Sequence, residues 1–246
     1  MMSQASRTAI VTGAARRIGA ALASALVSDG WTVLAHVRHA DDMVPDGCAK
    51  VVADLAAEDC ADRIFAAADQ LPPVRLLVNN AGRFAFDDLG GFDPKEFNAH
   101  MAVNVQAPVQ LIERFAAAQA DGEDALVVNI LDAKLAAPNP DFLSYTLSKQ
   151  ALAGLTELAA RALAPRGIRV NGIALGLVLR SPGQSEENFA AMHRANPLGR
   201  GVEPDDIAET LRYLVEARCL TGQVLLLDSG QRFLGLGRDV QFLECE

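Results

Sequence analysis

The chain has 246 residues, of which 50% are hydrophobic and 22% charged, and its formal net charge at pH 7 is −9. This length suits one large α/β domain with a sizeable core. Because nucleic acids and anionic membranes bind basic surfaces, the acidic balance argues against both as partners and leaves a small-molecule substrate.

Apolar strand patterns alternate with helical patterns along the whole chain, without a repeat or a low-complexity linker. This alternation predicts βαβ units and a parallel sheet with right-handed crossovers. We expect a single domain over 1–246, with strands at 8–12, 32–37, 49–53, 75–79, 125–131, 168–174 and 223–228, and helices near 17–29, 59–70, 94–119, 144–164 and 204–216. Residues 177–197 interrupt the alternation, and we interpret them as a mobile lid over a substrate.

The first strand leads directly into a glycine-bearing turn, Thr12-Gly-Ala-Ala-Arg-Arg-Ile-Gly19, which is followed by a helical pattern. In this order, backbone N–H groups and the positive end of the helix face an anion, and glycine allows a phosphate to approach closely. A tight βα turn that holds no ligand is the alternative interpretation.

Ligands of a doubly wound sheet bind outside the carboxyl ends of its strands. Several polar or small residues stand at these ends, and we expect one cleft to collect Gly13, Asp54, Asn79, Asp132 and Gly176. Taken singly, Asp54 is also consistent with the start of a helix, Asn79 with a turn, and Asp132 with an ordinary loop aspartate.

Tyr145 and Lys149 lie four residues apart at the start of a long helical pattern. Residues with this spacing share one helix face, so the ammonium can stabilise the phenolate and lower the phenol pKa. A phenol tuned in this way is a candidate proton donor. The spacing alone is a weak signal, and its weight comes from the motifs around it.

These motifs together resemble the short-chain dehydrogenase/reductase family, from Thr8 to about Phe233. The family carries its motifs in a fixed order, and this chain shows in that order Thr12-Gly13, Asn79-Asn-Ala-Gly82, Asn104, Asp132 and Tyr145 with Lys149. The resemblance implies a Rossmann-like doubly wound sheet of seven parallel strands with helices on both faces. It also implies that Asp132, Tyr145, Lys149 and Asn104 are catalytic.

Three departures from the usual family pattern point to one branch. Arg17 replaces the middle glycine of the first motif, Asp132 replaces the usual catalytic serine, and Phe84 follows the Asn79–Asn80 pair. All three are features of the pteridine reductases and their dihydromonapterin reductase relatives. Arg83, by contrast, stands where those relatives carry a small residue.

The resemblance also implies a nicotinamide cofactor in the cleft. The residues expected to bind it are Gly13, Arg16, Arg17, Ile18, Gly19, Arg38, His39, Asp54, Leu55, Asn80, Ala81, Gly82, Tyr145, Lys149 and Gly176. Enzymes that prefer NAD place a carboxylate after the second strand, whereas a 2′-phosphate is bound by arginine. Here that strand ends in Ala35-His-Val-Arg-His39. We therefore expect NADPH, unless Arg38 and His39 only form an exposed loop.

Replacing the catalytic serine with Asp132 changes the electrostatics of the predicted site. A carboxylate beside the phenol disfavours the phenolate and opposes Lys149, so Tyr145 stays protonated and acts as a donor. A carboxylate also holds an amidine-like edge by paired hydrogen bonds, and a pterin presents such an edge. We expect Asp132, Tyr145 and Phe84 to bind the substrate, Phe84 by stacking on it; the alternative for Phe84 is one more core phenylalanine.

We therefore expect an NADPH-dependent reductase of a dihydropterin-like C=N bond, with the proton coming from Tyr145 or from a water ordered by Asp132. Two alternatives stay open: a carbonyl reductase of unknown substrate, because fold does not fix substrate, and a non-catalytic dinucleotide-binding protein.

Four further expectations concern the environment of the protein. The cysteines Cys48, Cys60, Cys219 and Cys245 have neither disulfide nor metal-ligand spacing, so we expect no metal. No targeting segment or membrane span is indicated, and we expect a cytoplasmic protein. Small residues after Tyr145 permit close helix approach, and the family resemblance implies a homotetramer that uses this helix. The apolar tail, 233–246, is expected to pack against a neighbouring subunit.

Overall fold

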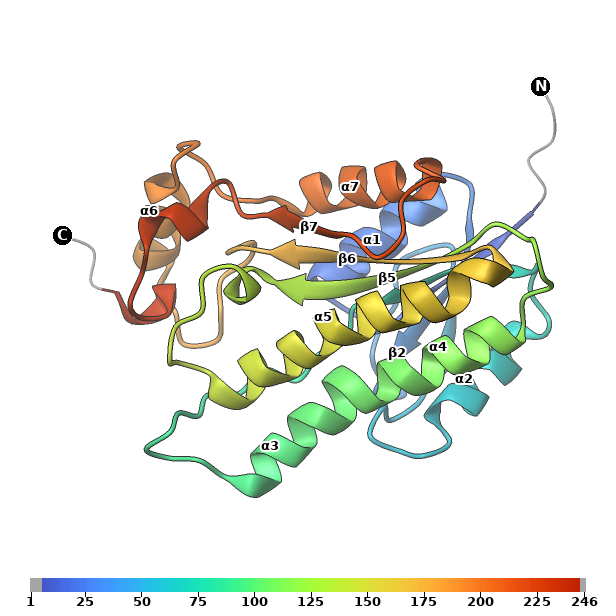
Figure 1. Ribbon diagram of the computed structural model, residues 1–246, viewed down its shortest axis with the longest axis horizontal. Coiled ribbons are helices and arrows are strands. Elements are labelled where there is room, and N and C mark those ends of the chain that lie inside the picture. Colours follow the sequence, from blue (N-terminus) through green and yellow to red (C-terminus); the bar gives the residue numbers. More distant parts are fainter. Residues whose placement is uncertain (1–5, 244–246) are drawn as a thin grey trace.

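A computed structural model describes residues 6–243 and shows seven parallel strands in one sheet, in the order β3-β2-β1-β4-β5-β6-β7 (Figure 1). Residues 1–5 and 244–246, among them Cys245 and the end of the predicted tail, lie outside the described residues. The strands are β1 (Thr8–Val11), β2 (Thr32–Val37), β3 (Cys48–Val52), β4 (Val74–Asn79), β5 (Ala125–Asp132), β6 (Ile168–Leu175) and β7 (Val224–Leu227). The predicted seven-stranded, doubly wound parallel sheet is confirmed.

Helices cover both faces of the sheet (Figure 1). The α-helices are α1 (Arg17–Ser28), α2 (Cys60–Ala68), α3 (Pro94–Met101), α4 (Ala107–Ala117), α5 (Leu143–Leu163), α6 (Glu186–Ala195) and α7 (Pro204–Glu216). Short 3₁₀ turns are η2 (Ala133–Leu135), η3 (Ala164–Arg166), η4 (Gln231–Leu234) and η5 (Val240–Phe242). None of the described helices is both long and apolar enough to cross a membrane.

One predicted helix is interrupted. The pattern over 94–119 indicates a single helix, but a π-helical turn, η1 (Ala102–Gln106), separates α3 from α4. Such turns widen the helix by one residue and occur mostly at functional sites. This turn contains Asn104, which was predicted to be catalytic, so the break in the helix coincides with a predicted site residue.

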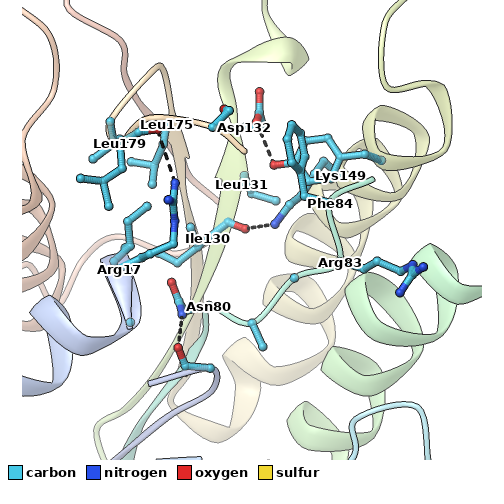
Figure 2. Close-up of a pocket in the computed structure, with 18 of the residues that line it drawn as sticks. Arg17, Asn80, Arg83, Phe84, Ile130, Leu131, Asp132, Lys149, Leu175 and Leu179 are labelled. Atoms are coloured by element: carbon cyan, nitrogen blue, oxygen red, sulfur yellow. Dashed lines mark hydrogen bonds between the residues drawn. The ribbon is translucent and has the colours of Figure 1, made fainter. Parts of the chain in front are cut away.

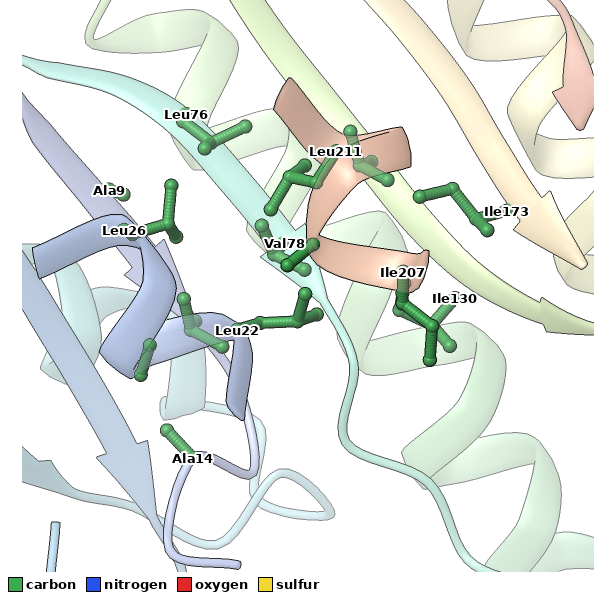
Figure 3. Packing of buried hydrophobic residues seen from close by; sticks show 14 of the residues in the cluster. Ala9, Ala14, Leu22, Leu26, Leu76, Val78, Ile130, Ile173, Ile207 and Leu211 are labelled. Atoms are coloured by element: carbon green, nitrogen blue, oxygen red, sulfur yellow. The ribbon is translucent and has the colours of Figure 1, made fainter. Parts of the chain in front are cut away.

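Each face of the sheet buries its own apolar cluster. On one face, α1 and α7 pack over β1, β4, β5 and β6 (Figure 3). On the other, α2, α4 and α5 cover Ile10, Leu77 and Val127 of the same strands. Because alternate residues of a strand point to opposite faces, strands buried on both sides read as continuous apolar runs. The two layers hold the strands in register, so that their carboxyl ends form one edge.

We expect Leu211→Ala to lower the free energy of unfolding by about 2–5 kcal/mol, because it leaves a cavity where α7 meets α1 and the sheet. Leu211 is 2% exposed and packs in the cluster of Figure 3. Chemical denaturation of this variant and of Leu89→Ala checks the expectation, because Leu89 is 84% exposed. Equal destabilisation by the two substitutions would contradict this description of the core.

Candidate active site

A cavity of about 1300 Å³ opens along the carboxyl edge of the strands. Its wall includes every residue predicted to bind the cofactor or the substrate and every predicted catalytic residue except Asn104. Asn79 was also expected in this cleft, but it is buried, and its Nδ2 donates to Oδ1 of Asn129 on the neighbouring strand at 2.8 Å. The sheet therefore brings together residues that are scattered from Gly13 to Gly176 in the sequence. The glycine turn lies at one end of this cavity and Tyr145 at the other.

The glycine turn is built around two close approaches of the backbone. Gly13 has a φ of +66°, and a Cβ there would lie 3.0 Å from the Cα of Ala81. A Cβ on Gly19 would lie 2.2 Å from the carbonyl oxygen of Gly13. Asn80 joins the two walls, because its Nδ2 donates to the carbonyl of Thr12 at 2.8 Å. Only glycine fits at these two positions, and the backbone is left open towards the cavity.

The amino end of α1 carries no side-chain cap and no acidic residue in its first turn. By contrast, Asp93 caps α3, Ser185 caps α6, and Glu203 with Asp206 forms a capping box on α7. The free N–H groups and the positive end of the helix dipole at α1 therefore suit an anion in the cavity.

Arg17 occupies a backbone conformation that favours glycine, with a φ of +55°. This explains why the family motif usually has glycine there, and it shows that Arg17 is held in place by its surroundings. Its guanidinium donates to the carbonyl of Arg180 at 3.0 Å. It also donates to the carbonyl of Leu179 at 3.4 Å (Figure 2). The side chain thus reaches across the cavity to the segment after β6, a contact that the sequence does not predict.

Arg38 and His39 lie in the cavity wall beyond β2, as their sequence position requires. Arg38 is 3.5 Å from the carboxylate of Asp54, and both side chains are well exposed. Asp42, which was not predicted from the sequence, also lines this end of the cavity. Its Oδ2 accepts a hydrogen bond from the backbone N–H of His39 at 3.0 Å, which engages that carboxylate.

His36 is a second residue of the cavity wall that was not predicted from the sequence. Its Nδ1 accepts from the N–H of Gly13 at 3.2 Å, and its Nε2 lies 3.0 Å from the carbonyl of Ala53. Burial lowers the pKa of His36, against the hydrogen bond to Ala53 and the charge of Asp54. A neutral ring with a proton on Nε2 satisfies both contacts and ties the glycine turn to the end of β3.

At the other end of the cavity, the Tyr145 hydroxyl donates to Oδ2 of Asp132 at 2.8 Å (Figure 2). Asp132 is the last residue of β5, and the loop after it returns the chain to α5, which carries Tyr145. The backbone N–H of Lys134 donates to the other carboxylate oxygen at 2.8 Å. Lys149 donates to the carbonyl of Ile130 at 2.7 Å, so its ammonium also lies against β5.

The three ionisable side chains shift one another's pKa values. Burial, and then the charge and hydrogen bond of Asp132, raises the pKa of Tyr145 well above its ordinary value of 10.0. Burial also raises the pKa of Asp132 and lowers that of Lys149 to about 8, although attraction between the two charges opposes both shifts. Tyr145 is therefore a protonated donor at neutral pH.

Asn104 is buried behind the cavity wall. Its Nδ2 donates to Oγ of Ser148 at 2.9 Å, and its Oδ1 accepts from the N–H of Arg83 at 2.7 Å. The side chain thus joins the π turn to α5 and to the chain after β4. In this structure Asn104 positions the neighbours of Lys149 and does not itself face the cavity.

Phe84 faces the cavity and is 38% exposed, so it is not one more core phenylalanine. Its ring stacks on Phe142 with centroids 4.3 Å apart and meets the edge of Tyr145 at 4.7 Å. The side chain of the adjacent Arg83 extends away from Phe84 (Figure 2). Its Nε and Nη2 donate to the two carboxylate oxygens of Glu96. Arg83 is therefore part of the cavity wall, but its guanidinium is held by Glu96.

The carboxyl-terminal tail supplies part of the wall, which the sequence analysis did not predict. Leu236, Arg238, Asp239 and Val240 line the cavity, and Asp239 pairs with Lys134 at 3.0 Å. The tail was expected to pack against a neighbouring subunit. Within the chain, the ring centroid of Phe242 lies 5.4 Å from that of Phe86 and 6.0 Å from that of Phe142, and the contact with a neighbouring subunit stays a prediction. Phe233 remains 70% exposed.

The predicted lid begins as part of the same wall. Leu177, Val178, Leu179, Ser181 and Pro182 line the cavity, and α6 follows them. Asn188 of α6 donates to the carbonyl of Leu243 at 2.6 Å, so this segment and the tail are joined. Within residues 6–243, no group of three or more His, Cys, Asp or Glu side chains is arranged to hold a metal ion.

We expect Asp132→Asn to lower the pKa of Tyr145, because the substitution removes a negative charge and keeps a hydrogen-bond acceptor. Tyr145 and Tyr213 are the two tyrosines of the chain. A Tyr213→Phe background therefore assigns all tyrosinate absorbance to Tyr145. With Asp132 present, tyrosinate should form only well above pH 10.0. An unchanged titration in the Asp132→Asn protein would contradict the electrostatic coupling.

The comparisons with known proteins agree with this geometry. The family described as enoyl-(acyl carrier protein) reductase matches residues 13–232. An uncharacterized oxidoreductase of Methylorubrum extorquens is 32% identical over 92% of this chain and 98% of its own length. The 3-oxoacyl-(acyl-carrier-protein) reductase of Staphylococcus epidermidis is 28% identical over 91% of this chain and 98% of its own.

Among solved structures, the FolM alternative dihydrofolate reductase 1 of Brucella suis, crystallised with NADP, superposes with a TM-score of 0.86. It is 39% identical, and the match covers 93% of this chain and 96% of that one. The likeness extends through the cavity edge, since it spans nearly the whole sheet and its helices. The chain therefore belongs to the short-chain dehydrogenase/reductase family of oxidoreductases.

Proposed function

We propose that the protein is an NADPH-dependent reductase of a dihydropterin-like C=N bond. The observation that carries this proposal is the hydrogen bond from the Tyr145 hydroxyl to Asp132, which keeps a proton donor beside a carboxylate in the cavity wall. Phe84 lies across the edge of the same phenol and offers a flat apolar surface. A heterocycle that is both flat and rich in hydrogen-bond donors matches these two features together.

The cofactor is NADP(H), and the described residues fit it. The uncapped amino end of α1 and the glycine turn suit a pyrophosphate. Arg16, Arg17, Arg38 and His39 place positive charge and hydrogen-bond donors at that end of the cavity. The solved Brucella relative carries NADP. When bound, NADPH supplies the hydride for the reduction.

The chain's own residues then handle the proton. Tyr145 holds a proton on its hydroxyl because burial and Asp132 disfavour the phenolate. As the substrate nitrogen gains electron density, the phenol donates its proton to that nitrogen, directly or through a water held by Asp132. Nζ of Lys149 lies 5.7 Å from the centroid of the Tyr145 ring. Its positive charge stabilises the phenolate that forms. Its position also suits a ribose hydroxyl.

The pterin assignment rests on Asp132 and Phe84 and is supported by the likeness to a protein called an alternative dihydrofolate reductase. A carboxylate accepts two hydrogen bonds from an amino-pyrimidine edge, whereas a simple ketone offers none. The second candidate is a keto reductase, which the likeness to a 3-oxoacyl-(acyl-carrier-protein) reductase favours. The non-catalytic alternative does not account for the intact pair of Tyr145 and Asp132.

We also propose that the chain assembles as a homotetramer. Leu147 and Leu158 of α5 are 41% and 67% exposed. The small residues Ala151 and Gly154 lie between them on the same helix and permit a close approach of a second helix. A surface of this kind is expected to be covered in solution by another copy of the chain.

NADPH should bind at least about tenfold more tightly than NADH, a difference of about 1.4 kcal/mol, because the arginines attract a 2′-phosphate. Arg38→Asp should erase or reverse this preference without changing the fold, since Arg38 is an exposed side chain. Fluorescence titration of both cofactors against both proteins measures the effect. Equal affinities of the unaltered protein for NADPH and NADH would refute the proposed cofactor contacts.

Dihydropterin reduction should depend on both Asp132 and Phe84. Asp132→Ser should reduce it strongly while keeping or improving ketone reduction, and Phe84→Ala should weaken pterin binding by about 1–3 kcal/mol. Phe92→Ala is the matched control, because Phe92 is 48% exposed and lies outside the cavity wall. Steady-state kinetics on a dihydropterin and on a ketone panel decide the matter. A preference of the unaltered enzyme for ketones would favour the keto reductase.

A further inference from the structure

The amino end of α5, which carries Tyr145, is built in an unusual way. Phe142 holds the cap position with a φ of +58° and provides no side-chain hydrogen bond to the helix. The first turn contains no acidic residue. A left-handed bulky residue is strained and persists only where its surroundings hold it. The free N–H groups of this buried helix end must therefore find acceptors elsewhere in the chain.

Asp87 supplies these acceptors from a position 57 residues away in the sequence. Its Oδ1 accepts from the N–H of Ser144 at 2.9 Å, and its Oδ2 accepts from the Ser144 hydroxyl. Its backbone carbonyl accepts from the N–H of Leu143 at 3.1 Å. Asp87 is 4% exposed and Ser144 is fully buried. Asp87, in the loop between β4 and α3, thus accepts from the first two N–H groups of α5.

The same contact stabilises the buried carboxylate of Asp87. Among the described ion pairs, no lysine, arginine or histidine lies within 4.0 Å of its carboxylate. A buried carboxylate without a cationic partner is stabilised by N–H donors and by the positive end of a helix dipole. Both are present at the start of α5, so the position of Asp87 and that of the helix end depend on each other.

This cap joins two parts of the catalytic site. Tyr145 directly follows Ser144, and Phe84 lies three residues before Asp87. The two rings meet at 4.7 Å, and Phe84 stacks on Phe142, the strained residue at the helix end. A movement of the first turn of α5 would therefore shift both the phenol and the surface on which Phe84 lies.

We propose that Asp87 is a positioning residue for proton transfer: it holds the first turn of α5 so that the Tyr145 hydroxyl meets Asp132, and it fixes Phe84 in the same action. The inference rests on the proposed role of Tyr145 as the proton donor. An ordinary helix cap would only stabilise the fold. A positioning cap also raises kcat, and it does so by holding Tyr145 in place.

A double-mutant cycle separates these roles. Asp87→Ala should lower kcat about tenfold or more, since a small misplacement of a reacting group costs this much or more, and NADPH affinity should stay within about twofold. Asp87→Asn keeps an acceptor for the Ser144 N–H and should retain kcat within about threefold. In a Tyr145→Phe background, Asp87→Ala should change the residual rate less than about twofold, because coupled residues are not additive. The assay uses dihydrobiopterin or a ketone, whichever the unaltered enzyme turns over.

Asp206→Ala is the matched control, because it removes a capping carboxylate from α7. It should lower Tm in the same way as Asp87→Ala but leave kcat unchanged. An unchanged kcat in Asp87→Ala, a kcat loss that is equally large in the Tyr145→Phe background, or an Asp87→Asn protein as impaired as Asp87→Ala would each overturn the inference. Full activity of Tyr145→Phe alone would instead overturn the proposed function.

If Asp87→Ala does not fold, Ser144→Ala takes its place, since it removes only the hydroxyl contact and keeps the backbone hydrogen bond to Asp87. We expect a drop in kcat of about threefold that disappears in the Tyr145→Phe background. An unchanged kcat in Ser144→Ala would then overturn the inference.

Discussion

The hydrogen bond between Tyr145 and Asp132 is the contact on which the arrangement of this site depends. It joins the last residue of β5 to the first turn of α5, and the chain between them must reverse direction within a few residues. Lys134 stabilises this reversal from within: its N–H donates to Asp132, and its ammonium donates to Asn139 at 2.6 Å. The shape of the cavity around Tyr145 follows from this one turn.

Burial of Asp132 and Lys149 beside this contact places a cost on folding. The raised pKa of Asp132 means that its contribution to stability is full below pH 3.8 and is lost as pH rises through the folded pKa. The lowered pKa of Lys149 means that its contribution is present above pH 10.5 and is lost as pH falls through about 8. Above the folded pKa of Asp132, and below that of Lys149, each side chain is charged and opposes folding. Groups kept at such a cost are typical of catalytic sites.

Most of the fold and most residues of the cavity wall could be predicted from the sequence, for one physical reason. Parallel strands buried on both faces read as plain apolar runs, and their carboxyl ends share an edge, so residues that follow them must meet. Gly13, Asp54, Asp132 and Gly176 were predicted in this way and line the cavity, whereas Asn79 is buried within the sheet. The ends of the predicted strands differ from those observed by one residue at most, because the turn residues that bound them are plain in the sequence.

What the sequence did not predict arises from contacts between distant segments. The π turn around Asn104, the tie between Arg17 and the carbonyls after β6, and the tail in the cavity wall each depend on tertiary packing that no local pattern records. Asp87 is the clearest case, because its partner lies 57 residues away and the cap position itself is held by a phenylalanine. A helix that lacks its own cap in the sequence is nevertheless a signal that another segment must supply one.

These distant contacts have one effect in common: each holds a strained backbone position beside the cavity. Arg17 at the glycine turn and Phe142 at the start of α5 both have positive φ, and each is held by residues far away in the sequence. Such conformations cost on the order of 1–3 kcal/mol each and persist only where packing compensates for them. Arg17 stands where the amino end of α1 faces the part of the cavity that binds the cofactor. Phe142 stands where α5 begins and Tyr145 meets Asp132. The precision of the site therefore comes from the segments that hold these two residues, and the common sheet supplies only their approximate positions.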